Sequence, residues 1–204
     1  MIRNSFSSKH ATLVCAAVTV VVELASAPAS AQQFEIKPIA EKKIPQLPPG
    51  PLFWRIDNFA TLAQAQAEAG PTALAAEAAG KVWLFTLGAK GGSSPDGTKV
   101  AEVGPVPPFS APEYLLRINS AGGAPGAKTP VHTHSGSESF YVLTGELSQK
   151  TPHGVGHVSA GQTMPGHEPG MPMEVSSIGT SDLRVLVMFV TDATKPFSSP
   201  ATMP

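Results

Sequence analysis

The sequence predicts an all-β protein, built around one antiparallel β-barrel and carrying a short α-helical N-terminal extension. The chain has 204 residues, with 21 prolines and 19 glycines but a charged fraction of only 14%. This composition is typical of a turn-rich β-protein and argues against a helical bundle. Alternating apolar and polar residues, with turn residues about every 8 to 12 positions, dominate the C-terminal half. Because no internal repeat is visible, one barrel is favoured over two.

The first 31 residues have the features of a signal peptide. Arg3 and Lys9 precede an apolar run over residues 11–22, and Ala29-Ser30-Ala31 forms a cleavage site of the A-x-A kind. The apolar run is shorter than the roughly 20 residues that span a bilayer. We therefore expect an exported protein without a membrane anchor after cleavage, located in the periplasm of a Gram-negative cell or secreted from another host.

Charge and cysteine content exclude several classes of protein. The formal net charge is −1 and no run of Lys or Arg is present, so nucleic acid is not an expected partner. The single cysteine, Cys15, lies in the predicted signal peptide. The mature chain would then have no disulfide, no thiolate ligand and no cysteine nucleophile.

The N-terminal part of the mature chain is predicted to lie outside the barrel. Residues 32–51 are rich in proline and mixed charge, which indicates an arm or linker, either along a neighbouring subunit or free in solvent. Residues 52–112 should pack on the barrel as helices and strands. Within them, the alanine-rich stretch 61–79 is divided by Gly70-Pro71, and we expect two short surface helices there.

The strands are predicted from apolar runs and alternation. An apolar strand is expected over residues 81–87, and a second near 98–103 follows a turn at 94–97. The barrel should occupy residues 113–192, and residues 193–204 should form a C-terminal tail. The barrel strands are expected over 113–119, 138–147, 154–158 and 183–191.

The segment from Gly126 to Gly145 contains the residues of a metal site. In an extended chain, residues two apart point to the same face, so His132 and His134 should project side by side. Glu138 follows after Ser-Gly-Ser and can place its carboxylate on that face. Two imidazoles and one carboxylate leave other metal positions open and suit one divalent transition metal: Fe, Mn, Ni, Cu or Zn.

This segment resembles the first motif of the cupin superfamily, G-x5-H-x-H-x3-E-x6-G. All five positions match: Gly126, His132, His134, Glu138 and Gly145. The resemblance covers residues 113–192 and implies a small, jelly-roll-like antiparallel β-barrel with the metal inside. It also implies that His132, His134 and Glu138 are metal ligands. The alternative is a degenerate site that keeps these residues as a polar patch without metal.

The second cupin motif is incomplete. Its nearest counterpart begins at Gly170 and places Met173 where the fourth ligand, a histidine, belongs, and Ser177 where an asparagine belongs. A thioether is a weak ligand for a hard divalent ion. Two alternatives remain: a three-ligand site, which we favour, or a fourth ligand supplied by Met173 or by another histidine. His167 is the first of these histidines, with His153 and His157 on the preceding hairpin.

The predicted strand that begins at Glu138 indicates which residues form the wall of the pocket. Phe140 and Val142 share the inward face of Glu138 and should form an apolar wall beside the metal. Tyr141 and Leu143 should point outward, where they offer an apolar surface for a homodimer. Two further polar residues on the next strand, Glu146 and Gln149, are either pocket acid–base groups or exposed strand-end residues.

The leading functional hypothesis is a metal-dependent oxygenase, an oxidoreductase of the dioxygenase type, that acts on a small organic molecule. His167 is a candidate proton carrier near the metal, and no other catalytic residue is identified. The alternative is a periplasmic protein that binds or senses a metal or small ligand without catalysis, since cupins include both classes. A metal-assisted isomerase, epimerase or decarboxylase is a third reading.

Overall fold

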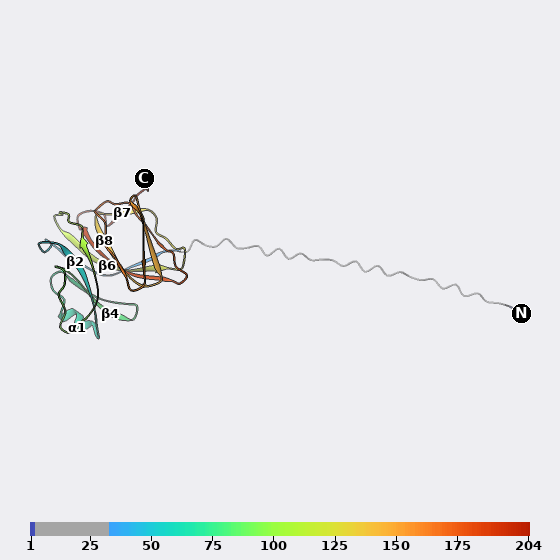
Figure 1. The fold of residues 1–204 in the computed structure, drawn as a ribbon, viewed down its shortest axis with the longest axis horizontal. Helices are drawn as coiled ribbons and strands as arrows, with labels where there is room; N and C mark the ends of the chain where they lie inside the picture. The colour runs from blue at the N-terminus through green and yellow to red at the C-terminus, as the bar shows by residue number, and fades with distance from the viewer. Residues whose placement is uncertain (3–32) are drawn as a thin grey trace. The chain divides into compact units, whose positions relative to one another are not determined.

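The computed structural model describes residues 1–2 and 33–204, so the predicted signal peptide and its cleavage site lie almost wholly outside the described residues. Residues 33–204 are mainly β-structure, as Figure 1 shows. The elements in this part are β1 (Glu35–Ile44), β2 (Leu52–Phe59), α1 (Leu62–Ala67), β3 (Ala73–Ala78), β4 (Lys81–Gly88), β5 (Thr98–Val106), β6 (Tyr114–Gly123), β7 (His132–His134), β8 (Gly136–Thr144), β9 (Glu146–Thr151), β10 (Gly154–Ser159), β11 (Thr163–Met164), β12 (Glu174–Ser177), β13 (Leu183–Asp192) and β14 (Ser198–Pro200).

A five-stranded antiparallel sheet forms the centre of the fold, in the order β1-β6-β13-β8-β11. Its middle strand, β13, is a nearly continuous apolar run because both of its faces are covered. Val185 and Val187 belong to one buried cluster, and Leu186 and Met188 to another on the opposite face.

One face of the central sheet and the sheet β10-β9-β12 enclose the first core. Leu147, Val158 and Val175 contribute from the three-stranded sheet and pack with Phe140 and Val185. The short pair β14-β7 lies at the end of this layer. The prediction of an all-β, antiparallel fold is confirmed, with the strands arranged as facing sheets.

The other face of the central sheet is covered by a four-stranded sheet, in the order β3-β4-β2-β5. Trp83 of β4 packs edge-on against Tyr141 of β8, with 6.1 Å between ring centroids. Tyr141 is therefore buried, and Leu143 is partly buried against the same core. The expectation that these two residues form an exposed apolar surface is wrong, because alternation specifies the face but not what covers it. A homodimer stays a prediction without this surface to support it.

The alanine-rich stretch contains one helix, not two. Thr61 and Gln64 form a capping box at the start of α1, whereas the second half is β3. Alanine favours helix over strand, but β3 pairs along its whole length with β4 and buries Leu74 and Ala76. Tertiary pairing thus overrides the local preference.

Both ends of the predicted mature chain belong to the sheets. The proposed arm contains β1, which pairs with β6 from Glu35 to Ile44 with an irregularity near Pro38. A proline is tolerated here because β1 is an edge strand. The proposed tail contains β14, which pairs with β7, the strand that carries His132 and His134.

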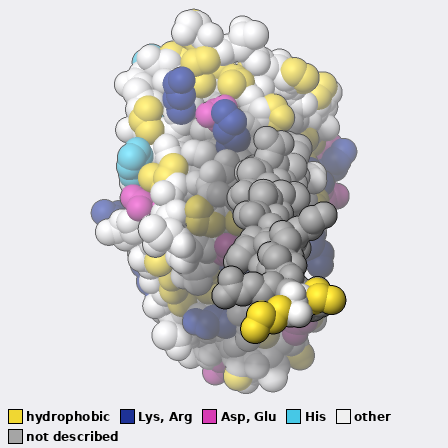
Figure 2. All heavy atoms as spheres, turned by 90° about the vertical axis from the view of Figure 1, so that its right-hand side faces the viewer, with side chains coloured by type: hydrophobic (Ala, Val, Ile, Leu, Met, Phe, Trp, Pro, Cys, Tyr) yellow, Lys and Arg dark blue, Asp and Glu magenta, His cyan; other side chains and the backbone are white. Residues whose placement is uncertain are grey.

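On the face drawn in Figure 2, outside the part shown in grey, charged side chains lie scattered among hydrophobic and uncharged polar ones. Positive and negative groups alternate there without an extended basic patch. The absence of a nucleic-acid partner remains a prediction. Within the part of the chain that the structure describes, no helix combines the length and the apolar character needed to cross a membrane.

Candidate metal centre

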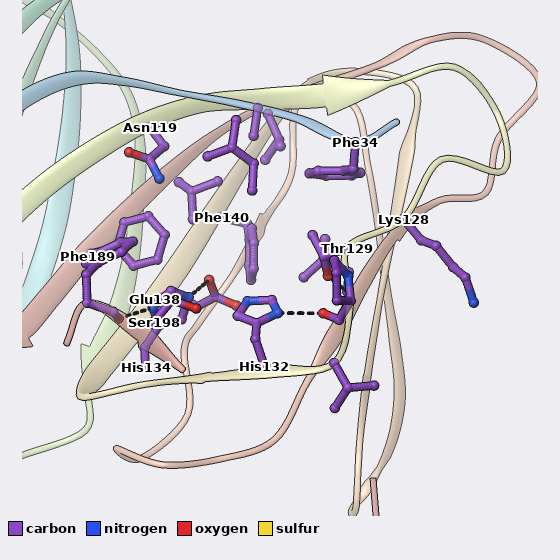
Figure 3. A pocket seen from close by; sticks show the side chains of 18 of the residues that line it. Phe34, Asn119, Lys128, Thr129, His132, His134, Glu138, Phe140, Phe189 and Ser198 are labelled. Carbon is purple, nitrogen blue, oxygen red and sulfur yellow. Dashed lines mark hydrogen bonds and ion pairs between the residues drawn. The ribbon is translucent and has the colours of Figure 1, made fainter. Parts of the chain in front are cut away.

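The three residues of the motif meet at one end of a cavity (Figure 3). His132 and His134 are the two ends of β7, and Glu138 lies near the start of β8. One ligand atom from each residue lies within 4.8 Å of the others. Gly136 lets the start of β8 lie close to β13, since a Cβ atom there would clash with the Val190 carbonyl group. Local spacing therefore brings the three side chains together as predicted.

Backbone carbonyl groups fix both imidazole rings in one tautomer. His132 Nδ1 lies 2.8 Å from the Pro130 oxygen, and His134 Nδ1 lies 2.6 Å from the Phe197 oxygen. A carbonyl oxygen only accepts, so each Nδ1 carries the proton and donates it. The Nε2 atom of each ring then has a free lone pair, which is the arrangement found in metal-binding histidines.

Burial shifts the pKa values of Glu138 and His134 in opposite directions. Burial raises the pKa of Glu138 to about 8, although the hydrogen bond from Gln149 opposes the shift. Burial also lowers the pKa of His134 to about 4. Burial thus favours the neutral form of both groups at the 3.5 Å contact between His134 Nε2 and Glu138 Oε2.

The donor set fits a divalent transition metal. Two neutral imidazole nitrogens and one carboxylate are ligands for Fe, Mn, Ni, Cu or Zn, and a cation would stabilise the charged form of a carboxylate that is otherwise buried and neutral. The set does not select among these metals. The three donor groups lie together at one end of the cavity, so a metal ion held by them would face the open cavity on its other side.

Gln149 connects Glu138 to both residues considered as a fourth ligand. Its Nε2 atom donates to Glu138 Oε1 at 3.1 Å and lies 3.4 Å from Met173 Sδ. Its Oε1 atom accepts from His167 Nε2 at 3.0 Å. Neither Met173 nor His167 lines the cavity. The fourth-ligand role of either residue stays a prediction, and so does the proton-carrier role of His167, because the Gln149 amide separates it from Glu138.

The sequence predicts that Gln149 is either a pocket acid–base group or an exposed strand-end residue. The second expectation is wrong, because Gln149 is only 2% exposed. Its distance from Glu138 along the chain is 11 residues, and the contact depends on the turn at Gly145, where φ is +75°. Alternation along β9 indicates that Gln149 shares the inward face with Leu147, which is the only signal in the sequence for its role.

The cavity beside His132, His134 and Glu138 has a volume of about 690 Å³. Phe140 lines it, whereas Val142 is fully buried in the adjoining core and lies outside the lining. Apart from these three motif residues, Lys128 is the one titratable residue among the described residues of the lining, and it pairs with Glu174 at 3.1 Å. The apolar part of the wall comes mainly from Phe34, Ile36, Phe140, Val185, Val187, Phe189 and Phe197.

Two of these aromatic residues come from segments predicted to lie outside the barrel. Phe34 precedes β1, and Phe197 precedes β14. The ring of Phe197 packs 4.8 Å from His134 and 4.9 Å from Phe189, measured between centroids. Local sequence gives only a weak signal for such residues: a large aromatic side chain within an otherwise polar, proline-containing segment.

Removing residues 197–204 should lower metal affinity about 10- to 100-fold, as loss of an outer-shell partner typically does. The physical reason is that His134 loses both the carbonyl group that holds its Nδ1 proton and the ring that packs against it. Zinc affinity by competition with a chromophoric chelator measures the effect. A chain ending at Ala201 keeps β14 and should bind as the full chain does; equal loss in both truncations would contradict the role of Phe197.

Comparison with known proteins gives matches in three dimensions only. No protein-family model matches the chain, and no curated protein matches its sequence. Solved structures similar to it include a cupin-like protein from Thermotoga maritima, with 15% identity, a TM-score of 0.39, and 43% of this chain and 65% of that one covered. The DMSP lyase DddQ from Ruegeria pomeroyi has 18% identity, a TM-score of 0.37 and coverages of 42% and 43%.

A polyketide cyclase, RemF from Streptomyces resistomycificus, matches with 19% identity, a TM-score of 0.37 and coverages of 44% and 62%. In each of the three comparisons the match spans less than two thirds of the other protein. The matches also include proteins described as a cupin superfamily protein from Desulfitobacterium hafniense and as a protein with a double-stranded β-helix domain from Klebsiella pneumoniae, with TM-scores of 0.34 and 0.37.

Proposed function

We propose that this protein is a metal-dependent oxygenase that oxidises a small, largely apolar organic molecule with O2. The observation that carries the proposal is the position of the three donor groups at one end of an apolar cavity of about 690 Å³. In this proposal His132, His134 and Glu138 hold the metal. When bound, the metal supplies a centre at which an organic molecule and O2 can react together.

The rest of the cavity binds and shields the organic molecule. Phe34, Phe140 and Phe189 supply aromatic surface for its apolar part, and the burial of this surface favours binding. The same side chains limit access of water to the reacting atoms. The C-terminal segment, through Phe197, closes this wall next to His134.

The scarcity of acid–base groups in the cavity favours oxygenation over isomerisation or decarboxylation. Proton-transfer reactions need a positioned acid or base near the substrate. Among the described lining residues, the only titratable group besides the three ligands is Lys128, whose side chain is 61% exposed and paired with Glu174. When the organic molecule itself supplies all four electrons that O2 accepts, both oxygen atoms enter the product without an external reductant, and no such acid or base is required.

The same scarcity also favours a second candidate, a protein that binds a metal or small ligand without catalysis. Such a protein needs affinity but no reactive group. The incomplete second motif, in which Met173 takes the place of the histidine, is compatible with it. The two candidates differ in one measurable property, the consumption of O2 with a bound organic molecule.

Oxygen uptake by protein loaded separately with Fe(II), Mn(II), Ni(II) or Cu(II) tests the proposal. With a panel of phenols, flavonoids and thiols, we expect uptake that needs both metal and an organic compound. The His132→Ala/His134→Ala variant should show none above the free metal. Tight binding of a panel compound without uptake would favour the binding protein, and product formation without O2 would favour the isomerase or decarboxylase class.

We also propose export, on the basis of the residue pattern of positions 1–31. The mature chain should then begin at Gln32. N-terminal sequencing of the protein recovered from the periplasm of a Gram-negative expression host tests this, and a chain retained in the cytoplasm with Met1 or Ile2 as its first residue would contradict it.

A further inference from the structure

One polar side chain in the apolar part of the cavity has no partner. Asn119 lies on β6, between Pro38 of β1 and Val187 of β13. It is 2% exposed and lines the same cavity as the three ligands. No hydrogen bond joins either end of its amide group to a described residue: the Oδ1 atom is fully buried, whereas the amide nitrogen faces the cavity and is free to donate. An unpaired amide in an apolar wall is costly, and a leucine of similar size would fill the place without this cost.

The alternation of β6 turns Asn119 toward the cavity. Leu116 and Ile118 face the four-stranded sheet, so Asn119 and Ala121 face the cavity side, and both line it. Figure 3 shows Asn119 away from the three ligands, beyond Phe189, with its amide nitrogen directed toward the aromatic side chains of the cavity. A ligand in the cavity can therefore meet two N–H donors at this place.

We propose that Asn119 determines substrate specificity by donating a hydrogen bond to a carbonyl or carboxylate oxygen of the substrate. The substrate class is then a small molecule with metal-binding oxygen atoms at one end, an apolar middle that lies against Phe140 and Phe189, and an acceptor oxygen at the other end. This inference rests on the proposed function, because the metal holds the first end. It assigns the second end to a residue that takes no part in metal binding.

Pairs of aryl hydroxamates test the inference with zinc-loaded protein, in which no oxidation occurs. The hydroxamate group binds the metal, and the far end carries either an acetyl group, which accepts a hydrogen bond, or an isopropyl group of similar shape. Both 3- and 4-substituted benzohydroxamates are compared, because the direction of the cavity decides which ring position brings the substituent nearer to Asn119. Calorimetry gives each dissociation constant.

In the parent protein, the better-placed acetyl compound should bind about five- to tenfold more tightly than its isopropyl partner, as expected for one hydrogen bond in an apolar site. Asn119→Leu should abolish or reverse this ratio while zinc content and unsubstituted benzohydroxamate affinity remain as in the parent. Val185→Ala is the matched control: it enlarges the same wall, so both affinities should fall and the ratio should persist.

Two results would overturn the inference while leaving the metal site intact. One is an acetyl-to-isopropyl ratio of one or less in the parent protein, a comparison that does not depend on the folding of any variant. The other is an unchanged ratio in Asn119→Leu. Failure of benzohydroxamate itself to bind, or binding that persists in His132→Ala/His134→Ala, would contradict the proposed function together with the inference.

Discussion

The affinity of the protein for a divalent metal should rise about tenfold for each pH unit between pH 6.5 and 8, and level off above that range. Burial raises the pKa of Glu138 to about 8, so below that pH the carboxyl group holds a proton which the metal must displace. His134 adds no proton in this window, because burial lowers its pKa to about 4. Zinc affinity, measured by chelator competition at constant ionic strength, gives the slope.

The matched variant is Glu138→Gln, which keeps the size of the side chain and the contact with Gln149 but removes the titrating group. It should bind zinc more weakly than the parent, and its pH dependence between pH 6.5 and 8 should lose the contribution of one proton. A parent protein whose affinity does not change across this range would mean that Glu138 is already ionised without metal, or that it is not a ligand.

Replacing Trp83 by alanine should lower the free energy of unfolding by about 3–5 kcal/mol, the range for loss of a large aromatic side chain from a core. Trp83 is 1% exposed and lies between the four-stranded sheet and the central sheet. Its ring contacts Tyr141, and its Nε1 atom donates to the Ala78 oxygen at 2.9 Å. The variant therefore leaves both a cavity and an unpaired carbonyl group. Urea denaturation measures the change.

Two substitutions separate these effects. Trp83→Phe keeps an aromatic ring at the interface but loses the donor, and should cost less than Trp83→Ala. Val155→Ala removes an apolar side chain that is 57% exposed and should change stability by no more than about 0.5 kcal/mol. If Trp83→Ala cost as little as Val155→Ala, the four-stranded sheet would not share a core with the central sheet.

The features that sequence predicted well are local or repetitive. His132 and His134 are two residues apart on one strand, and Glu138 opens the next, so their meeting requires only strand alternation and one turn. The continuous apolar run of β13 likewise indicates a strand that is buried on both faces. A five-position motif with fixed gaps could thus be interpreted without any knowledge of long-range contacts.

The features that sequence did not predict depend on distant contacts. Phe197 is 63 residues from His134, and nothing in the tail indicates that its carbonyl group reaches the metal centre. The strand β3 forms from alanines because β4 pairs with it, against local propensity. The burial of Tyr141 required knowledge that Trp83 covers that face.

The role of Asn119 could not be predicted for a different reason. Its position on the inward face follows from alternation, but a polar residue at such a position is usually paired within the protein. Only the structure shows that the described residues leave its Oδ1 atom without a partner, in a cavity shared with His132 and Glu138.

The most direct test of the metal centre is the metal content of the mature protein, purified without a histidine tag and measured by plasma mass spectrometry beside the His132→Ala/His134→Ala variant. We expect about one transition-metal ion per chain in the parent and almost none in the variant, because the variant lacks two of the three proposed ligands. Equal content in both proteins, or none in the parent after reconstitution with each of the five metals, would contradict a metal centre at these residues.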